Sequence, residues 1–344
     1  MTLQNKCGIL FSIFRIHSDG RKPYRQATEA YESPGFALRH DDRAIEWPTL
    51  LLLIVTYGLW AASTTVIWGY APVLAIAGAA IAIAQFSSLQ HEVLHGHPFA
   101  NQTLSEATVF PALTVYVPYL RFKDTHLQHH FDPNLTDPYD DPESNYQDPQ
   151  VWAKLNGAAR AFLIFNNTLA GRMLLGPAVS MWALLRGDTA AILRGNRRVA
   201  LAWALHLPGL ALVFGWLWAV GAMPVWAYLT AAYIGWSLLK IRTYLEHRAH
   251  DAARARSVVV ESRGPLSLLF LNNNFHTVHH SNPTVAWYRL PQLYFANRDH
   301  YLRRNDGYVY RNYTQIFRAH LFRAKDPVAH PVWPVAKLAP DAVD

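Results

Sequence analysis

The fold is decided by the run "WPTLLLLIVTYGLWAASTTVIWGYAPVLAIAGAAIAIAQFSSLQ", residues 47–90, and by the "HEVLHGH" that follows it at residues 91–97. The run is 44 residues long and contains no Asp, Glu, Lys or Arg. A helix needs about 20 predominantly apolar residues to cross the hydrocarbon of a bilayer. The run therefore predicts two crossings, over about residues 47–68 and 72–90, with a turn near "WGYAP" at residues 68–72.

A second uncharged run covers residues 199–239 and has its turn near "GAMP", residues 221–224. It predicts two further spans, over about residues 199–220 and 224–245. Two buried hairpins of a soluble protein would require shorter apolar runs and charged loops. The apolar stretches 107–120 and 161–185 are too short or too interrupted for an ordinary span, and we expect them to be re-entrant, interfacial or part of a cap. The expected fold is an all-α membrane protein with two transmembrane helical hairpins and a helical cytoplasmic cap.

Composition supports a membrane protein and excludes several other classes. Of the 344 residues, 51% are hydrophobic and only 16% are charged, against about 25% charged in soluble domains. The net charge of +7 comes from Lys and Arg that flank the apolar runs, which favours contact with a membrane over binding of nucleic acid. A single cysteine, Cys7, excludes an internal disulfide framework and any multi-cysteine zinc or iron–sulfur site.

The distribution of basic residues predicts the orientation. Both hairpin turns are short and uncharged, whereas Arg and Lys lie at the other ends of the spans. The positive-inside rule then places both termini in the cytoplasm. We expect a cytoplasmic segment over residues 1–46, a transmembrane and catalytic domain over 47–280 and a second cytoplasmic segment over 281–344. The short apolar patch near the N-terminus is expected to be uncleaved, on the membrane surface or in a packed loop.

The histidines form three compact boxes. Of 17 histidines, eight lie in "HEVLH", "HLQHH" and "HTVHH", namely His91, His95, His126, His129, His130, His276, His279 and His280. Residues three or four apart project from one side of a helix, so each box can direct its imidazoles to one point. Burying so many imidazoles without partners would cost several kcal/mol. Eight ligands exceed one catalytic site of three protein ligands, so the boxes predict two metal ions. Spacing does not identify the element.

The order of the boxes, with "NNNF" directly before the third, resembles the membrane fatty acid desaturases and the related hydroxylases, ketolases and hydrocarbon oxygenases. The resemblance covers about residues 47–280. It implies two iron ions, O2 as co-substrate and a site at the cytoplasmic ends of the helices. It also implies one more histidine ligand after the second hairpin, for which the "EHR" triplet of "TYLEHRAH" selects His247. The implied metal ligands are His91, His95, His126, His129, His130, His247, His276, His279 and His280.

Other polar residues near the boxes are expected to orient the ligands. Ligating histidines commonly donate their second ring N–H to a carboxylate or another acceptor. For the acids of residues 132–141 we prefer a solvated loop, because prolines punctuate this stretch. Desaturases more often carry Asp where this chain has Glu92. The candidates for such supporting positions are Glu92, His97, Asp124, Glu246, His250, Asn272 and Asn273.

The resemblance implies oxidation of an unactivated C–H bond in a fatty acyl or other alkyl chain, with desaturation as the expected outcome. A hydroxylase or hydrocarbon oxygenase with the same site is the alternative. The chain contains no cysteine set for an iron–sulfur cluster and no Rossmann fingerprint. We therefore expect a separate electron donor of the ferredoxin, rubredoxin or cytochrome type. The expected location is a bacterial inner membrane, with the active site on the cytoplasmic side.

Two other functions remain open from the sequence. His91, Glu92 and His95 match the HExxH pattern of zinc peptidases, but an intramembrane peptidase would leave six clustered histidines without a role. A metal transporter would place its ligands near the middle of the membrane, whereas these boxes follow the ends of the apolar runs.

Overall fold

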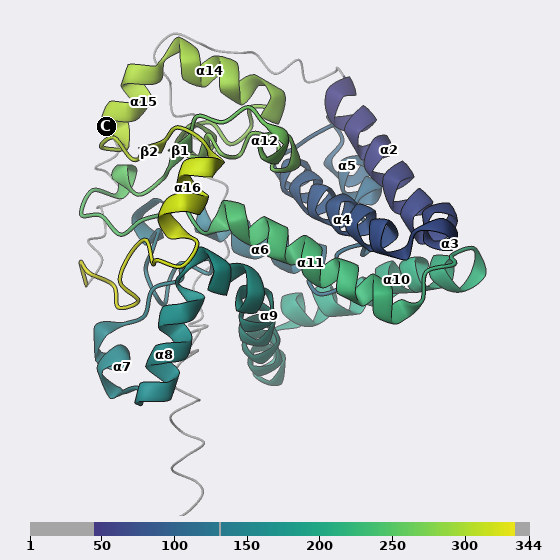
Figure 1. Ribbon diagram of the computed structural model, residues 1–344, viewed down its shortest axis with the longest axis horizontal. Coiled ribbons are helices and arrows are strands. Elements are labelled where there is room, and N and C mark those ends of the chain that lie inside the picture. Colours follow the sequence, from purple (N-terminus) through teal and green to yellow (C-terminus); the bar gives the residue numbers. More distant parts are fainter. Residues whose placement is uncertain (1–44, 131, 334–344) are drawn as a thin grey trace, which may run out of the picture.

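The computed structural model describes residues 45–130 and 132–333 (Figure 1). The parts of the two predicted cytoplasmic segments before residue 45 and after residue 333, including the apolar N-terminal patch and Cys7, lie outside the described residues. The main helices are α2 (Trp47–Ala62), α3 (Trp68–Tyr70), α4 (Pro72–Leu94), α5 (Gln102–Thr108), α6 (Tyr119–His129), α7 (Pro149–Lys154), α8 (Gly157–Asn166), α9 (Leu169–Leu193), α10 (Arg197–Ala219), α11 (Val225–Thr243), α12 (Pro265–Leu269), α13 (His276–Ser281), α14 (Leu290–Ala296), α15 (Arg298–Arg304) and α16 (Tyr313–His320).

The chain is mostly helical, as predicted. A π-helical turn, Ser63–Ile67, joins α2 to α3, and short 3-10 turns lie at Asp132–Asn134, Ala253–Ala255 and Trp287–Arg289. In the described part of the chain, the named strands are β1 (Val259–Val260) and β2 (Val309–Tyr310), which pair in parallel. This pair ties the segment before the third box to the segment after α15.

Three helices are long and apolar enough to cross a membrane, namely Trp47–Tyr70, Pro72–Leu94 and Arg197–Ala219. They cover three of the four predicted spans, so the protein is a membrane protein. The fourth predicted span forms α11, which is long enough, with 19 residues, but is not apolar enough to be one of the candidate spans. α8 and α9 meet the criteria only as a pair bent by 109°, which makes them either one broken span or a re-entrant element.

Close packing of α4 against α11 forms the centre of the helical bundle. The first half of α4 is rich in alanine, and Ala79, Ala80 and Ile83 are fully buried. A Cβ added at Gly235 of α11 would lie 2.9 Å from the Ala80 carbonyl oxygen and 3.1 Å from Ile83 Cγ2. Small residues let helix backbones approach closely in a membrane, where the hydrophobic effect contributes little to helix association.

Polar side chains inside the bundle bond to one another or to backbone. Tyr228 of α11 is fully buried and donates to the carbonyl of Leu113 at 2.8 Å, while Trp60 of α2 donates to the Tyr228 hydroxyl at 3.0 Å. A buried hydroxyl without a partner would be costly. These bonds therefore fix α2, α11 and the loop after α5 relative to one another.

The outer faces of the apolar helices are covered with large apolar side chains. Leu51, Ile54 and Val55 of α2 and Leu207 and Leu212 of α10 are more than half exposed. Contiguous apolar surface of this kind is rare on soluble monomers and is typical of a lipid-facing surface. In Figure 1, α2, α4, α10 and α11 lie together, and α12, α14, α15, α16 and the strand pair gather beyond one end of α4 and α11.

We expect Gly235→Ala to destabilise the protein by about 1–3 kcal/mol, because the added methyl group forces α4 and α11 apart. Thermal unfolding in detergent, followed by circular dichroism, measures this as a lower melting temperature. Gly215→Ala in α10 is the control, since nothing lies within 4 Å of its added Cβ; it should leave the melting temperature unchanged or slightly higher. Equal melting temperatures for both variants would contradict the packing argument.

Candidate metal centre

Four segments present the predicted ligands. The last turn of α4 carries His91, and His95 is its C-terminal cap. α6 carries the second box and ends at it, with His130 as the cap. α13 begins at His276 and carries the third box, and His247 follows α11 in a bridge with Ser257. Each box therefore lies at or near a helix end, where its side chains can extend beyond the helix.

The nine predicted ligands lie in two groups. Within each group, one ligand atom per residue lies within 4.8 Å of every other. The first imidazole group is His91, His95, His126, His130 and His279, and the second imidazole group is His129, His247, His276 and His280. Each group draws on residues from three segments that are far apart in the sequence. All nine side chains are buried or half-buried.

The ring nitrogens within each group are unusually close. In the first group, His130 Nε2 lies 2.9 Å from His126 Nε2 and 3.2 Å from His279 Nε2. In the second group, Nε2 of His247 lies 2.9 Å from that of His129 and 3.0 Å from that of His276. Neighbouring ligands bound at about 2.1 Å to one ion are about 3 Å apart. The spacing fits nitrogens that share a cation.

A hydrogen-bond network among these nitrogens is not a sufficient alternative. His130 Nε2 contacts two other Nε2 atoms, and one ring nitrogen cannot donate and accept in both directions at once. His91 Nε2 and His95 Nε2 are buried and have no hydrogen-bond partner among the described residues. Leaving buried polar atoms without partners costs about 1–3 kcal/mol each. The donor set therefore fits one metal ion in each group.

The opposite ring nitrogens contact oxygen acceptors. His126 Nδ1 lies 2.9 Å from Glu143 Oε1, and His129 Nδ1 lies 2.8 Å from Asp141 Oδ1. His276 Nδ1 lies 3.0 Å from Asn273 Oδ1, and His247 Nδ1 lies 3.3 Å from Ser257 Oγ. An acceptor at Nδ1 keeps the proton there and directs the Nε2 lone pair toward the centre of the group.

Electrostatics keeps most of these imidazoles neutral, as metal ligation requires. Burial, reinforced by neighbouring histidines, holds the pKa of His130, His247, His276, His279 and His280 well below its usual value. His129 differs. Burial lowers its pKa, but Glu143 and Asp141 outweigh this effect and raise that pKa to about 9. The acids thus concentrate negative charge beside the second imidazole group.

Glu246 supports His276 indirectly. Asn273 Nδ2 donates to Glu246 Oε1 at 3.4 Å, and the same carboxylate oxygen lies 3.7 Å from His276 Nδ1. Arg242 pairs with Glu246 at 2.8 Å. The structure therefore brings Glu246 and Asn273, two of the predicted supporting residues, against the third box.

Glu46, Glu92 and His97 form a polar clamp beside the first box. His97 Nδ1 lies 2.7 Å from Glu46 Oε2, and His97 Nε2 lies 3.7 Å from Glu92 Oε1. These three residues are also mutually close enough to hold a metal ion. However, the two carboxylates contact opposite nitrogens of the His97 ring, and a metal ion could bind only one of these two nitrogens. The arrangement therefore fits an ion-paired imidazolium better. Glu92 also accepts from the backbone N–H of Trp287 at 2.8 Å.

Three predicted supporting residues lie away from the imidazoles. Asp124 pairs with Arg198 at 2.7 Å. His250 contacts Asp306 at 3.3 Å. Asn272 donates to the Trp287 carbonyl at 3.2 Å. Their contacts join segments around the site and do not reach a ligand.

Sequence reasoning missed Glu143 and Ser257, and it assigned Asp141 to a solvated loop. Asp141 is buried, and its second oxygen accepts from Thr136 N at 2.8 Å. Both acids lie in the loop after the second box, where a tight turn folds the chain back over α6. The presence of several acids directly after this box was the available indication, but no spacing rule selects among them.

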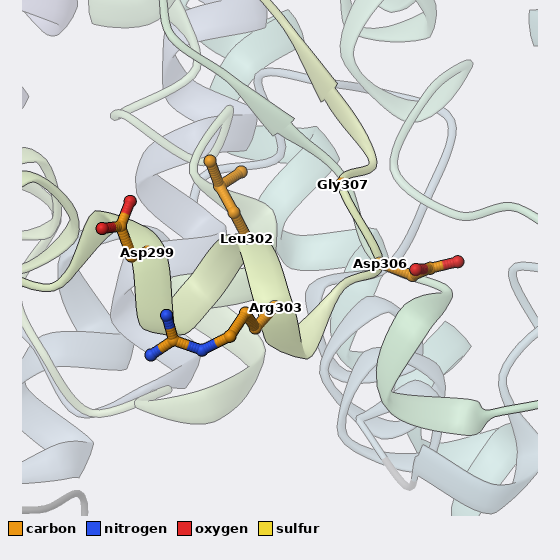
Figure 2. A pocket seen from close by; sticks show the side chains of 5 residues that line it. All are labelled: Asp299, Leu302, Arg303, Asp306 and Gly307. Carbon is orange, nitrogen blue, oxygen red and sulfur yellow. The ribbon is translucent and has the colours of Figure 1, made fainter.

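A surface pocket lies beside α15, apart from the histidines. Figure 2 shows it lined by Asp299, Leu302, Arg303, Asp306 and Gly307. None of these residues is a predicted ligand, and the pocket contains no histidine. It is therefore not part of the candidate metal centre.

Comparison with known families gives one match. Residues 63–312, well over half of the chain, match the model of the fatty acid desaturase family. The match contains all nine predicted ligands. No curated protein matches the chain.

Removing the acceptor of His276 should weaken metal binding. We expect Asn273→Ala to lower the affinity of the second imidazole group by about 10–100-fold, the usual effect of losing such a partner. Competition with a chelator measures this change. Asn272→Gly is the control. The side-chain amide of Asn272 does not reach a ligand, and glycine adopts the φ of 53° found at this position without strain. Equal loss of affinity in both variants would show that the Nδ1 contact is not responsible.

Proposed function

The chain belongs to the fatty acid desaturase family, and from this premise we propose that it holds two iron ions and uses O2 to oxidise an unactivated C–H bond. The proposed substrate is a fatty acyl or other alkyl chain, and the proposed outcome is desaturation. The observation that carries the proposal is the pair of imidazole groups, in which Nε2 atoms from distant segments face one another at about 3 Å. Family membership implies an oxidoreductase and a lipid substrate.

Iron is the metal that the family implies, and imidazole ligands are compatible with it. Iron bound in both groups would supply the reduction of O2 and the removal of hydrogen from the substrate. The residues of this chain have other tasks. The acceptors at Nδ1 orient the imidazoles, and burial of His126, His129, His276 and His279 keeps water from the centre.

An apolar substrate suits the position of the centre. His91 and His95 lie at the end of α4, which is one of the candidate spans. Substrate in the bilayer can reach this end of the bundle along the apolar helices without passing through water. We propose that the centre and both termini lie on the cytoplasmic side, in a bacterial inner membrane, because basic residues gather at this end.

Electrons must come from another protein, which we propose to be a ferredoxin, rubredoxin or cytochrome. The described C-terminal region supplies a basic surface for it. Exposed arginines on or near α15 and α16 include Arg303, Arg311, Arg318 and Arg323. Charge complementarity mainly accelerates association and favours an acidic partner.

A hydroxylase or hydrocarbon oxygenase is the alternative with the same residues. The sequence offered a zinc peptidase as another possibility, but this function has less support. A peptidase would need Glu92 free to activate water, whereas Glu92 contacts Trp287 N and His97. The first imidazole group also contains three more histidines than His91 and His95, the two of the HExxH pattern.

The product of the reaction decides the function. Purified protein loaded with iron, supplied with a reductant, O2 and a panel of lipids, should give a product two mass units lighter than its substrate. A product sixteen units heavier would indicate hydroxylation. His276→Ala is expected to abolish turnover, because it removes one ligand of the second imidazole group. One zinc per chain and no lipid oxidation in the wild-type protein would contradict the proposal.

Electron transfer from an acidic donor should depend on salt. We expect the rate to fall steeply as ionic strength rises to about 1 M, where the Debye length is about 3 Å. Stopped-flow reduction of the iron-loaded protein measures the rate. Arg318→Glu should slow the reaction at low salt and leave it unchanged at high salt. A rate indifferent to ionic strength would exclude steering by this surface.

A further inference from the structure

Glu143 is the carboxylate that lies between the two imidazole groups. It follows the second box in the loop between α6 and α7. Its Oε1 lies 2.9 Å from Nδ1 of His126, a member of the first group. Its Oε2 lies 3.8 Å from Nε2 of His129, the nitrogen that faces the second group. The two oxygens of one side chain therefore face different groups.

The neighbouring acid differs in this respect. Asp141 contacts His129 Nδ1 and the Glu143 backbone N–H with one oxygen and accepts from Thr136 N with the other. Both of its oxygens are occupied, and neither contacts the inner nitrogen of a ligand. Glu143 Oε2 has no hydrogen-bond partner in the described part of the chain, and 26% of the Glu143 side chain is exposed.

The two groups also differ in the number of donors. The first contains five imidazoles and the second contains four. Two donors bound to one ion at about 2.1 Å are separated by about 3.0 Å when adjacent and by about 4.2 Å when opposite. The separation of 3.8 Å between Glu143 Oε2 and His129 Nε2 falls within this range. Glu143 is not among the four mutually close residues, so it lies at the edge of the second group, more than 4.8 Å from at least one of the four ligand atoms, and its side chain would have to turn inward to bind the same ion.

We propose that Glu143 supplies the fifth donor of the second imidazole group through Oε2 while it holds His126 of the first group through Oε1. This inference rests on the proposed function, since it assumes that both groups bind metal. It makes the two sites chemically different. The first has only imidazole donors, whereas the second has one anionic oxygen donor in addition to its imidazoles.

Cobalt(II) is a suitable probe, because its visible absorption reports the donors and their number. Metal-free full-length protein in detergent is titrated with cobalt(II), as the wild type and as Glu143→Gln. The amide oxygen of glutamine can still accept from His126, but the side chain no longer offers an anionic oxygen to the second group. We expect the wild type to bind two ions. In Glu143→Gln the first site should be unchanged, and the second should lose at least about 10-fold in affinity, with altered absorption.

Glu106→Gln is the matched control. Glu106 also contacts α6, through Lys123, and its side chain is 25% exposed, but it touches no imidazole. It should bind both ions as the wild type does. Glu143→Asp keeps the charge and shortens the side chain by one methylene group, so the second site should again weaken. Glu143→Asp thus tests the reach of the carboxylate even if Glu143→Gln folds poorly.

The titrations distinguish three results. Two wild-type-like sites in both Glu143 variants would overturn the role of Glu143 and leave the proposed function intact. Fewer than two sites in the wild type would overturn the proposed function itself. Loss of the second site alone in Glu143→Gln, a weakened second site in Glu143→Asp and two intact sites in Glu106→Gln would support the inference.

Discussion

The site depends on the approach of imidazole nitrogens, most of them kept neutral by burial, to about 3 Å within each group. Hydrogen bonds among the rings do not satisfy all of these nitrogens, and a bound cation would offset the cost of burying so many polar atoms. The oxygen acceptors behind the rings determine which nitrogen faces inward. Glu143, Asp141 and Asn273 are therefore as necessary to the geometry as the histidines they contact.

The membrane helices and the site are linked through α4. Its alanine-rich half packs against Gly235 of α11, and its last turn carries the first histidine box. The clamp of Glu46, His97 and Glu92 continues this link to the start of α2, and Glu92 extends it to Trp287, which follows the third box. Close helix packing in the bilayer thus fixes the first box relative to the third, although the two belong to separate parts of the sequence.

The helical class could be predicted from the sequence. Three of the four predicted spans are helices long and apolar enough to cross a membrane, and the nine predicted ligands lie together in the structure. These follow from periodic patterns, because uncharged length predicts a span and a spacing of three or four predicts a common helix side. Glu143 and Ser257 were not predicted, since they lie in loops whose course depends on distant contacts. His247 was distinguished from His250 by family resemblance, and the structure separates them because His247 lies in the second imidazole group and His250 contacts Asp306.

His279 and His280 are consecutive, yet they belong to different imidazole groups. A ribosome therefore completes both groups within one step of elongation, after every other histidine of the two groups has been made. A nascent chain that ends before this point has neither group complete, however many of the earlier histidines have already emerged. A chain truncated before His279 would consequently lack both groups together.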